Sequence, residues 1–318
     1  MNIEDLKAEF GAYYLKNGQN LARLFKLLNI RSVTDKVLTP IKTDETVWRA
    51  AKASIGRVLQ PFQKAWTPIG EVEFSPIAIE QFKQKIDSEE YPDDLEASWA
   101  GFLAGEGLDR TEWPFVRWYV EVMLLPQAEE DYELNEVYWG VRAEPVAGTP
   151  GAAGTSINGI RKAINDQITA GRITPIATGA PDADNTVWVQ QVESFTDAIT
   201  QRYQHIPMQL AMNQSLEKRF HRGYRELYGK NTDYKGSNGD VDFSNITIIG
   251  LPSMVGSNKI WCTPKGNGIH LSKRSRNKEI VKIESVDRLV KMFSDWSSGV
   301  GFIIPEIVFT NDQDLATV

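Results

Sequence analysis

The segment at residues 71–96 constrains the fold most, because it has too few apolar residues to form a core of its own. Its first part alternates like a β-strand, and Pro76 restricts such a strand to a sheet edge or an exposed hairpin. An acidic run at residues 87–96 follows. An extended segment with an apolar side and a charged tip needs a surface from a neighbouring domain or a neighbouring subunit. The alternating apolar set is Val72, Phe74, Pro76 and Ala78.

A long apolar helix is predicted to begin at Thr111, its expected N-cap. Pro126 is expected to kink or end this helix, and acidic helical sequence resumes as far as Trp139. Because the apolar residues recur at helical spacing, they share one broad face that must pack against other elements. These residues are Trp113, Val116, Tyr119, Val120, Met123 and Leu124.

Shorter helices are predicted on both sides of the long one. Two pieces are expected within residues 3–29, and a later helix runs from an N-cap at Ser156 to a stop at Gly171. Ser215 is expected to cap a basic helix that Gly229 closes. The expected strands are 208–212, 246–251, 259–263, 269–272, 279–285 and 301–310, with turns at 252–256, 265–268 and 296–299.

Composition excludes several classes of protein. The chain has 318 residues, and its one cysteine, Cys262, excludes an internal disulfide and a multi-cysteine metal site, as expected for a reducing cytosol. No apolar run approaches the roughly 20 residues of a membrane span. The acidic N-terminal residues are expected to be neither a secretory signal nor a transit peptide. A net charge of −7 argues against a general nucleic-acid binder.

The charge is unevenly distributed along the chain. Residues 1–150 carry 16 basic and 25 acidic side chains, whereas the remainder carries 19 and 17. One interpretation is that opposite patches on identical copies meet head to tail and close rings. Charge alone favours the other interpretation, two solvated faces. The acidic runs are 87–96 and 129–136, and the basic runs are 218–230 and 273–282.

No catalytic, cofactor-binding or metal site is predicted. His205, His221 and His270 lie far apart without zinc-ligand spacing, and His221 is interpreted as a surface or interface residue. Cys262, on a predicted strand, is expected to be an inert buried thiol. Asp240 and the residues after it lack the order of a calcium loop.

A glycine-rich loop precedes the helix that Ser156 is expected to cap. Gly148, Gly151 and Gly154 have the spacing G-x-x-G-x-x-G, which matches neither the dinucleotide fingerprint nor the P-loop. Pro145 also interrupts the strand that a nucleotide-binding loop would follow. The interpretation is a flexible loop.

Several passages resemble one protein family. NTVWVQQVESFTDAITQRYQHIPMQLAMNQSLEKRFHRGYRELYG, ITIIGLPSMVGSNKIWCTPKGNGIHL and VKMFSDWSSGVGFIIPEIVFTND are similar to segments of the major capsid proteins of tailed double-stranded DNA bacteriophages. The passage from LQPFQKAW to ASWAGFL is similar to capsid sequences from phages and prophages of gut Bacteroidetes. The resemblance covers nearly the whole chain and implies an α+β fold of the Hong Kong 97 type.

The resemblance assigns parts of a shell subunit and no catalytic residues. It implies an N-terminal arm at residues 1–45 and a region containing an extended loop at 46–110. A spine helix of the peripheral domain follows at 111–140, an axial domain at 141–268, and peripheral-domain strands at 269–318. The extended loop would overlap an adjacent subunit. Some family members cross-link a loop lysine to a neighbour's asparagine, and Lys83 and Lys85 lie on the candidate loop, although no motif marks them.

The implied function is self-assembly into pentamers and hexamers of an icosahedral or prolate head shell. The shell would enclose double-stranded DNA without sequence-specific binding. Expected partners are other copies, a portal protein, scaffolding and decoration proteins, with no membrane. The expected location is the virion capsid, assembled in the cytoplasm of the bacterial host. The alternatives are an encapsulin-like compartment, a tail or baseplate protein, and an unrecognised soluble enzyme.

Overall fold

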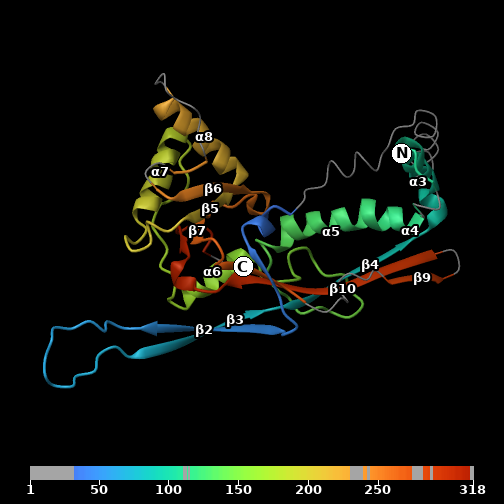
Figure 1. Cartoon of the computed structure of the whole chain (residues 1–318). Coiled ribbons are helices and arrows are strands. Elements are labelled where there is room, and N and C mark those ends of the chain that lie inside the picture. The colour runs from blue at the N-terminus through green and yellow to red at the C-terminus, as the bar shows by residue number, and fades with distance from the viewer. Residues whose placement is uncertain are drawn as a thin grey trace.

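One long strand, β10 (Leu289–Phe302), runs through the sheet around which the molecule is organised (Figure 1). The structure is a computed structural model that describes residues 32–109, 113, 115–229, 239–241, 244–273, 282–286 and 289–315. The helices predicted within residues 3–29 and the expected N-cap Thr111 lie outside these residues.

Strand β10 pairs with different strands along its first and last parts. Its first part pairs with β4 (Phe82–Glu90) and β9 (Lys282–Val286), and its last part pairs with β8 (Gly268–Ser272), all antiparallel. A short strand, β1 (Thr39–Lys42), extends the sheet in parallel with β8. A 3-10 turn, Thr34–Lys36, leads into β1.

The predicted turn at residues 296–299 is wrong, because these residues lie inside β10. Ser297 and Ser298 are buried there, and Ser298 pairs with both Phe82 and Ser272. Gly299 is needed for a close crossing: a Cβ at this position would fall on the Glu80 carbonyl oxygen. The glycine that looked like a turn signal therefore lets the chain before β4 pass over β10.

A continuous helical segment lies along the sheet (Figure 1). It consists of α4 (Phe115–Trp118), a π-helical stretch (Tyr119–Leu124), α5 (Leu125–Asp131) and a second π-helical stretch (Tyr132–Glu136). Helix α3 (Pro92–Glu106) packs beside it through a cluster that includes Phe102, Trp118 and Met292 of β10.

Of the two alternatives expected at Pro126, a kink or an end, the end of the helix is wrong. The helix continues through Pro126 because the preceding stretch is π-helical, so that the Leu125 amide donates to the Val120 carbonyl five residues back.

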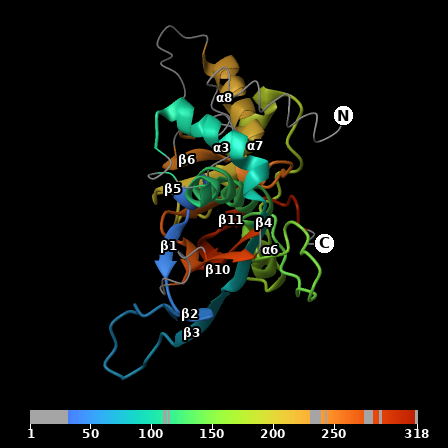
Figure 2. The same ribbon diagram turned by 90° about the vertical axis from the view of Figure 1, so that its right-hand side faces the viewer.

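A second, smaller unit stands at one end of the molecule and contains two long helices (Figures 1 and 2). Helices α7 (Asn185–Asp197) and α8 (Gln214–Tyr228) pack together and share an apolar cluster with the strands of a second, four-stranded sheet. The strand order is β11 (Phe309–Thr310), β7 (Trp261–Pro264), β5 (Met208–Asn213) and β6 (Ile246–Leu251). This unit also holds short turns at Pro252–Met254 and Pro305–Ile307.

Two expected N-caps differ from those of the structure. Helix α8 is capped by the Asn213 side chain, which accepts from the Ser215 amide at 2.9 Å. Helix α6 (Ile160–Thr169) begins after Gly159 instead of Ser156, whose amide donates to Glu136. Gly159 is required there because a Cβ would collide with the Tyr138 carbonyl oxygen.

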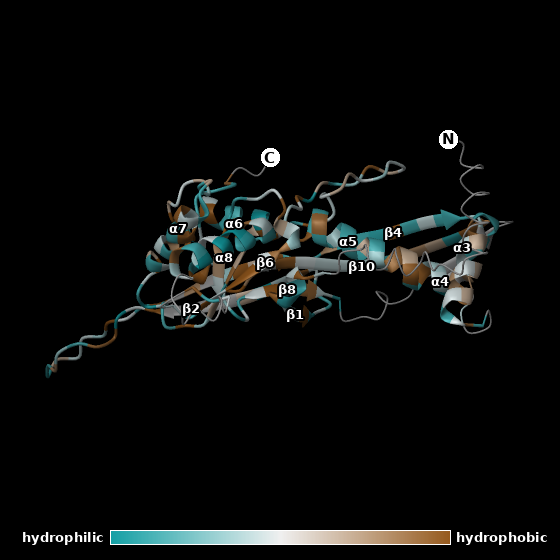
Figure 3. Cartoon of the chain, turned by 90° about the horizontal axis from the view of Figure 1, so that it is seen from above, coloured by the Kyte–Doolittle hydropathy of each residue, from teal (hydrophilic) through white to brown (hydrophobic). Residues whose placement is uncertain are grey.

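A two-stranded hairpin extends away from the rest of the chain (Figures 1 and 3). It consists of β2 (Val47–Ile55) and β3 (Val72–Glu80), paired antiparallel, with a long connection between them. Its root is held by Gln81, whose amide donates to the Thr46 carbonyl and whose side chain donates to the Thr43 and Glu45 carbonyls.

Gly299→Ala should destabilise the fold by about 1–3 kcal/mol, because the added methyl group collides with backbone at the hairpin root. Urea unfolding followed by fluorescence measures the change. Gly151→Ala is the matched control, since its Cβ meets only the Thr155 hydroxyl at 3.6 Å and should change stability by less than about 0.5 kcal/mol. Equal stability of the two variants would contradict this account of the crossing.

Lys259→Met should stabilise the chain at neutral pH. The Lys259 side chain is 0% exposed, its Nζ has no hydrogen-bond partner, and burial lowers the pKa from 10.5 to about 8, although Asp314 opposes this shift. Carrying the charge in the fold therefore costs about 3 kcal/mol at pH 7. The cost is complete below about pH 8 and disappears as the pH rises past 10.5, the unfolded value.

Urea unfolding of the native chain and Lys259→Met at pH 7 and at pH 10.5 tests the sign. The variant should be more stable by up to about 3 kcal/mol at pH 7, and the difference should shrink at the higher pH. Lys291→Met removes a half-exposed lysine 3.7 Å from Glu89 and should change stability by at most about 1 kcal/mol. A Lys259→Met chain that is less stable than the native chain at pH 7 would refute the prediction.

Candidate assembly surfaces

The tip of the β2–β3 hairpin presents large apolar side chains to solvent. Leu59 is 84% exposed, Phe62 92%, Trp66 93% and Phe74 68%. Among the described residues, these are the most exposed large apolar side chains of the chain, together with Val146. An apolar concentration of this kind on one projecting element marks an interaction surface.

The tip is ordered by its own polar side chains, which bind within the loop. Gln60 donates to the Thr67 carbonyl at 2.7 Å, Gln63 donates to the Thr67 hydroxyl, and Arg57 donates to the Leu59 carbonyl at 3.0 Å. The polar groups are thus used internally while the aromatic rings of Phe62 and Trp66 remain uncovered. In an ordinary surface loop, the polar side chains face water and the apolar side chains are covered.

The root of the hairpin packs onto the sheet by the face that the sequence pattern did not indicate. Ile77 and Ile79 are buried against Ile269 and Leu271 of β8. The predicted apolar set alternates with these isoleucines and is exposed on the opposite face: Val72, Phe74, Pro76 and Ala78. Because side chains alternate along a strand, both faces of β3 are apolar, and only the isoleucine face is covered within the chain.

The acidic run at residues 87–96 is not the tip of the extended segment. Asp87 and Glu89 lie on β4, which pairs with β10, and α3 begins at Pro92. The expectation of a charged hairpin tip is therefore wrong: the projecting connection carries Arg57 and Lys64 among apolar residues. The acidic run looked coreless because its apolar partners, on β10 and the long helix, are distant in sequence.

The two lysines considered for cross-linking lie on β4 and not on the projecting hairpin. The Nζ of Lys83 lies 3.5 Å from a carboxylate oxygen of Asp295 on β10, and Lys85 pairs with Asp87. The Asp87 hydrogen bond raises the pKa of Lys85. These pairs are exposed, so each contributes little to stability.

The basic run of α8 forms a stripe on its solvent face. Lys218, Arg222 and Arg225 are exposed and recur at helical spacing. Arg219 instead crosses to α7, where it donates to the Asn185 side chain at 3.1 Å and to the Asp182 carbonyl. The other basic run, 273–282, lies mostly outside the described residues.

The residues singled out as candidates for chemistry are separated in space. Cys262 is buried, and burial raises the pKa of its thiol. His221 is half-buried on α8 beside Phe220, whereas His270 lies on β8 and contacts Asp35. Within the described residues, no group of three or more histidine, cysteine, aspartate or glutamate side chains has the geometry of a metal site.

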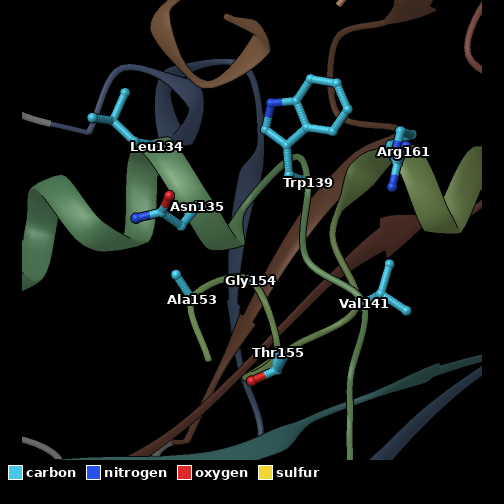
Figure 4. Close-up of a pocket in the computed structure, with 8 residues that line it drawn as sticks. All are labelled: Leu134, Asn135, Trp139, Val141, Ala153, Gly154, Thr155 and Arg161. Atoms are coloured by element: carbon cyan, nitrogen blue, oxygen red, sulfur yellow. The ribbon is translucent and has the colours of Figure 1, made fainter. Parts of the chain in front are cut away.

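Two amides at the end of the glycine-rich loop are already occupied by a carboxylate. Glu136 accepts from the Gly154 amide at 2.9 Å and from the Ser156 amide at 3.0 Å. A carboxylate at this position takes the place that a phosphate oxygen would need. Beside the loop is a cavity of about 390 Å³ (Figure 4), lined by Leu134, Asn135, Trp139, Val141, Ala153, Gly154, Thr155 and Arg161.

Arg161 covers one wall of this cavity. Its guanidinium lies 4.7 Å from the centre of the Trp139 ring, a cation–π contact.

No helix among the described residues has the length and apolar character of a membrane span.

Comparison with known proteins places the fold. No protein-family model matches the sequence, and no curated protein matches it. The satellite phage P4 procapsid, which includes the size determination protein, matches with a TM-score of 0.54 at 11% identity over 96% of each chain. The capsid of a native GTA particle matches at 0.50 and 12% identity, over 89% of this chain and 92% of that chain.

The capsid of the Myoviridae phage XM1 matches at a TM-score of 0.50 and 8% identity, over 89% of this chain and 92% of that chain. Each of these matches includes most of both chains, so the likeness concerns the whole architecture. The predicted α+β fold of the Hong Kong 97 phage capsid type is confirmed: the chain has the fold of these capsid proteins.

Proposed function

We propose that this chain is the major capsid protein of a tailed double-stranded DNA bacteriophage, self-assembling through pentamers and hexamers into a closed head shell. The observation that carries the proposal is the whole-chain likeness to capsid and procapsid subunits, together with an ordered, uncovered apolar hairpin tip. The proposed role is structural and includes no catalysis. Similarity to phages and prophages of Bacteroidetes belongs to the same proposal.

The proposed parts of the subunit are those that the family resemblance implies. The β2–β3 hairpin is the extended loop within residues 46–110, the long helix within 111–140 is the spine, and residues 141–268 form most of the axial domain with α7 and α8. Most of residues 269–318 return as peripheral strands, although β11 pairs with β7 in the sheet beside α7 and α8, and residues 1–45 form the arm. The hairpin covers an adjacent subunit, which buries Phe62 and Trp66.

Assembly by this route uses many repeated contacts between copies. A projecting element that binds a different patch on the next copy makes a heterologous contact, and such contacts close into rings when the rotation allows it. The aromatic tip would supply most of the buried area, while charged patches would orient the copies. Portal, scaffolding and decoration proteins are the further proposed partners, in a virion assembled in the host cytoplasm.

Phe62→Ser with Trp66→Ser should abolish assembly and leave the subunit folded. Both side chains are almost fully exposed in the single chain, so unfolding free energy should change by less than about 0.5 kcal/mol. Assembly should fail because the variant loses its apolar anchors. Negative-stain microscopy and size-exclusion chromatography of the native and variant chains measure the shells.

The control for this experiment is Ile79→Ala, which removes a buried side chain at the hairpin root. It should lower stability by about 2–5 kcal/mol. A native chain that stays monomeric, even with its phage partners present, would overturn the proposed function. Shells of normal yield from the double serine variant would overturn the role of the tip.

Purified shells should bind duplex DNA weakly at physiological salt. With a net charge of −7, the subunit gains little from phosphate neutralisation, and a Kd weaker than about 10⁻⁵ M is expected. An inner shell surface that binds DNA weakly would let an enclosed genome move along it. Fluorescence anisotropy with a labelled duplex over a range of salt concentrations tests this, and tight binding with a steep salt dependence would contradict it.

A further inference from the structure

A fully buried carboxylate holds the first described residues of the chain. Glu133 is 0% exposed, and it accepts from the Ser32 hydroxyl at 3.0 Å, the Thr34 amide at 3.2 Å and the Thr34 hydroxyl at 2.7 Å. The Thr34 hydroxyl also lies 2.6 Å from the Ser253 hydroxyl, in the short turn Pro252–Met254. Glu133 of the long helix therefore holds Thr34, and Thr34 in turn contacts Ser253.

The neighbouring residue of the same helix makes a second connection. The Tyr132 hydroxyl lies 3.2 Å from Nε2 of His270 on β8, and the two rings stack with centres 5.7 Å apart. Nδ1 of His270 lies 2.9 Å from a carboxylate oxygen of Asp35. Residues 32–35 are thus contacted by two side chains, Glu133 of the long helix and His270 of β8.

The π-helical stretch Tyr132–Glu136 makes this arrangement possible. The Val137 amide donates to the Tyr132 carbonyl, five residues back, which widens the turn. In the wider turn, Tyr132, Glu133 and Glu136 reach three different elements: β8, residues 32–34 and the glycine-rich loop. Such π-helical turns are rare and recur at functional positions.

A network of this kind specifies a geometry more than it adds stability. Burial raises the pKa of Glu133, and the hydrogen bonds from Thr34 and Ser32 oppose that shift. Desolvating a carboxylate offsets much of what its hydrogen bonds contribute, and apolar replacements of buried charged groups are often neutral or stabilising. What apolar contacts would not provide is a single path for residues 32–35.

We propose that Glu133 is a positioning residue that fixes the path of residues 32–36 between the long helix and β1. This inference rests on the proposed function, because the path of this segment matters for contacts with a second copy of the chain. The fastening itself is a property of the isolated subunit, so it can be tested without assembly.

The rate of tryptic cleavage after Lys36, an exposed residue directly after residues 32–35, reports how firmly this segment is held in unassembled subunits. Glu133→Gln places an amide that donates hydrogen bonds opposite the Thr34 and Ser32 donors, and Thr34→Val removes the hydroxyl. Each should raise the cleavage rate at least tenfold, with Thr34→Ser restoring the native rate. Ser88→Ala removes a hydroxyl contact to Tyr119 elsewhere on the helix and should leave cleavage unchanged. Native cleavage rates in both Glu133→Gln and Thr34→Val would overturn the proposal.

A disulfide between positions 34 and 253 distinguishes a positioning role of Glu133 from general misfolding of its variant. Thr34→Cys with Ser253→Cys joins two side chains whose oxygens lie 2.6 Å apart, and Cys262 is buried and does not compete. In the Glu133→Gln background, the oxidised form should regain protease resistance and shell yield, and the reduced form should lose both. A Glu133→Gln chain that is cleaved faster and still forms native shells would overturn the positioning role while leaving the proposed function intact.

Discussion

The pairing of β10 with β4 along its first part and with β8 along its last part is the constraint on which the rest of the structure depends. One strand holds β4 along its first part and β8 along its last part, so a single backbone sets the relation between the long helix and the hairpin root. At the change of partner, Gly299 admits the Glu80 carbonyl at a distance that no side chain permits. The direction of the projecting hairpin is therefore decided by backbone sterics at the buried end of β10.

Elements whose signals are local were predictable from the sequence. Residues 246–251 and 208–212 form strands as expected, and Gly229 closes α8 as expected. Features decided by distant contacts were not. The acids of β4 gave no sign that Val290 and Met292 would pair beside them, and Pro126 gave no sign of the π-helical turn before it.

The candidate surface was recognised in kind and misplaced in detail. Pro76 correctly indicated an exposed hairpin, because its missing donor is tolerated only where no further strand pairs. The face of β3 that packs within the chain carries Ile77 and Ile79 and not the predicted apolar set, and alternation alone cannot rank two apolar faces. The burial of Glu133 had no signal at all, because its partners Ser32 and Thr34 are ordinary residues far away in the sequence.

Affinity and direction are carried by different parts of this subunit, and that separation has a physical reason. Apolar side chains such as Phe62 and Trp66 provide free energy on burial but little directional preference. Hydrogen-bonded groups such as Glu133 provide direction and little net free energy. In the proposed function, a subunit that meets many copies of itself with weak contacts needs both. Placing the apolar anchors on a projecting hairpin and the polar network at a buried junction lets each act without weakening the other.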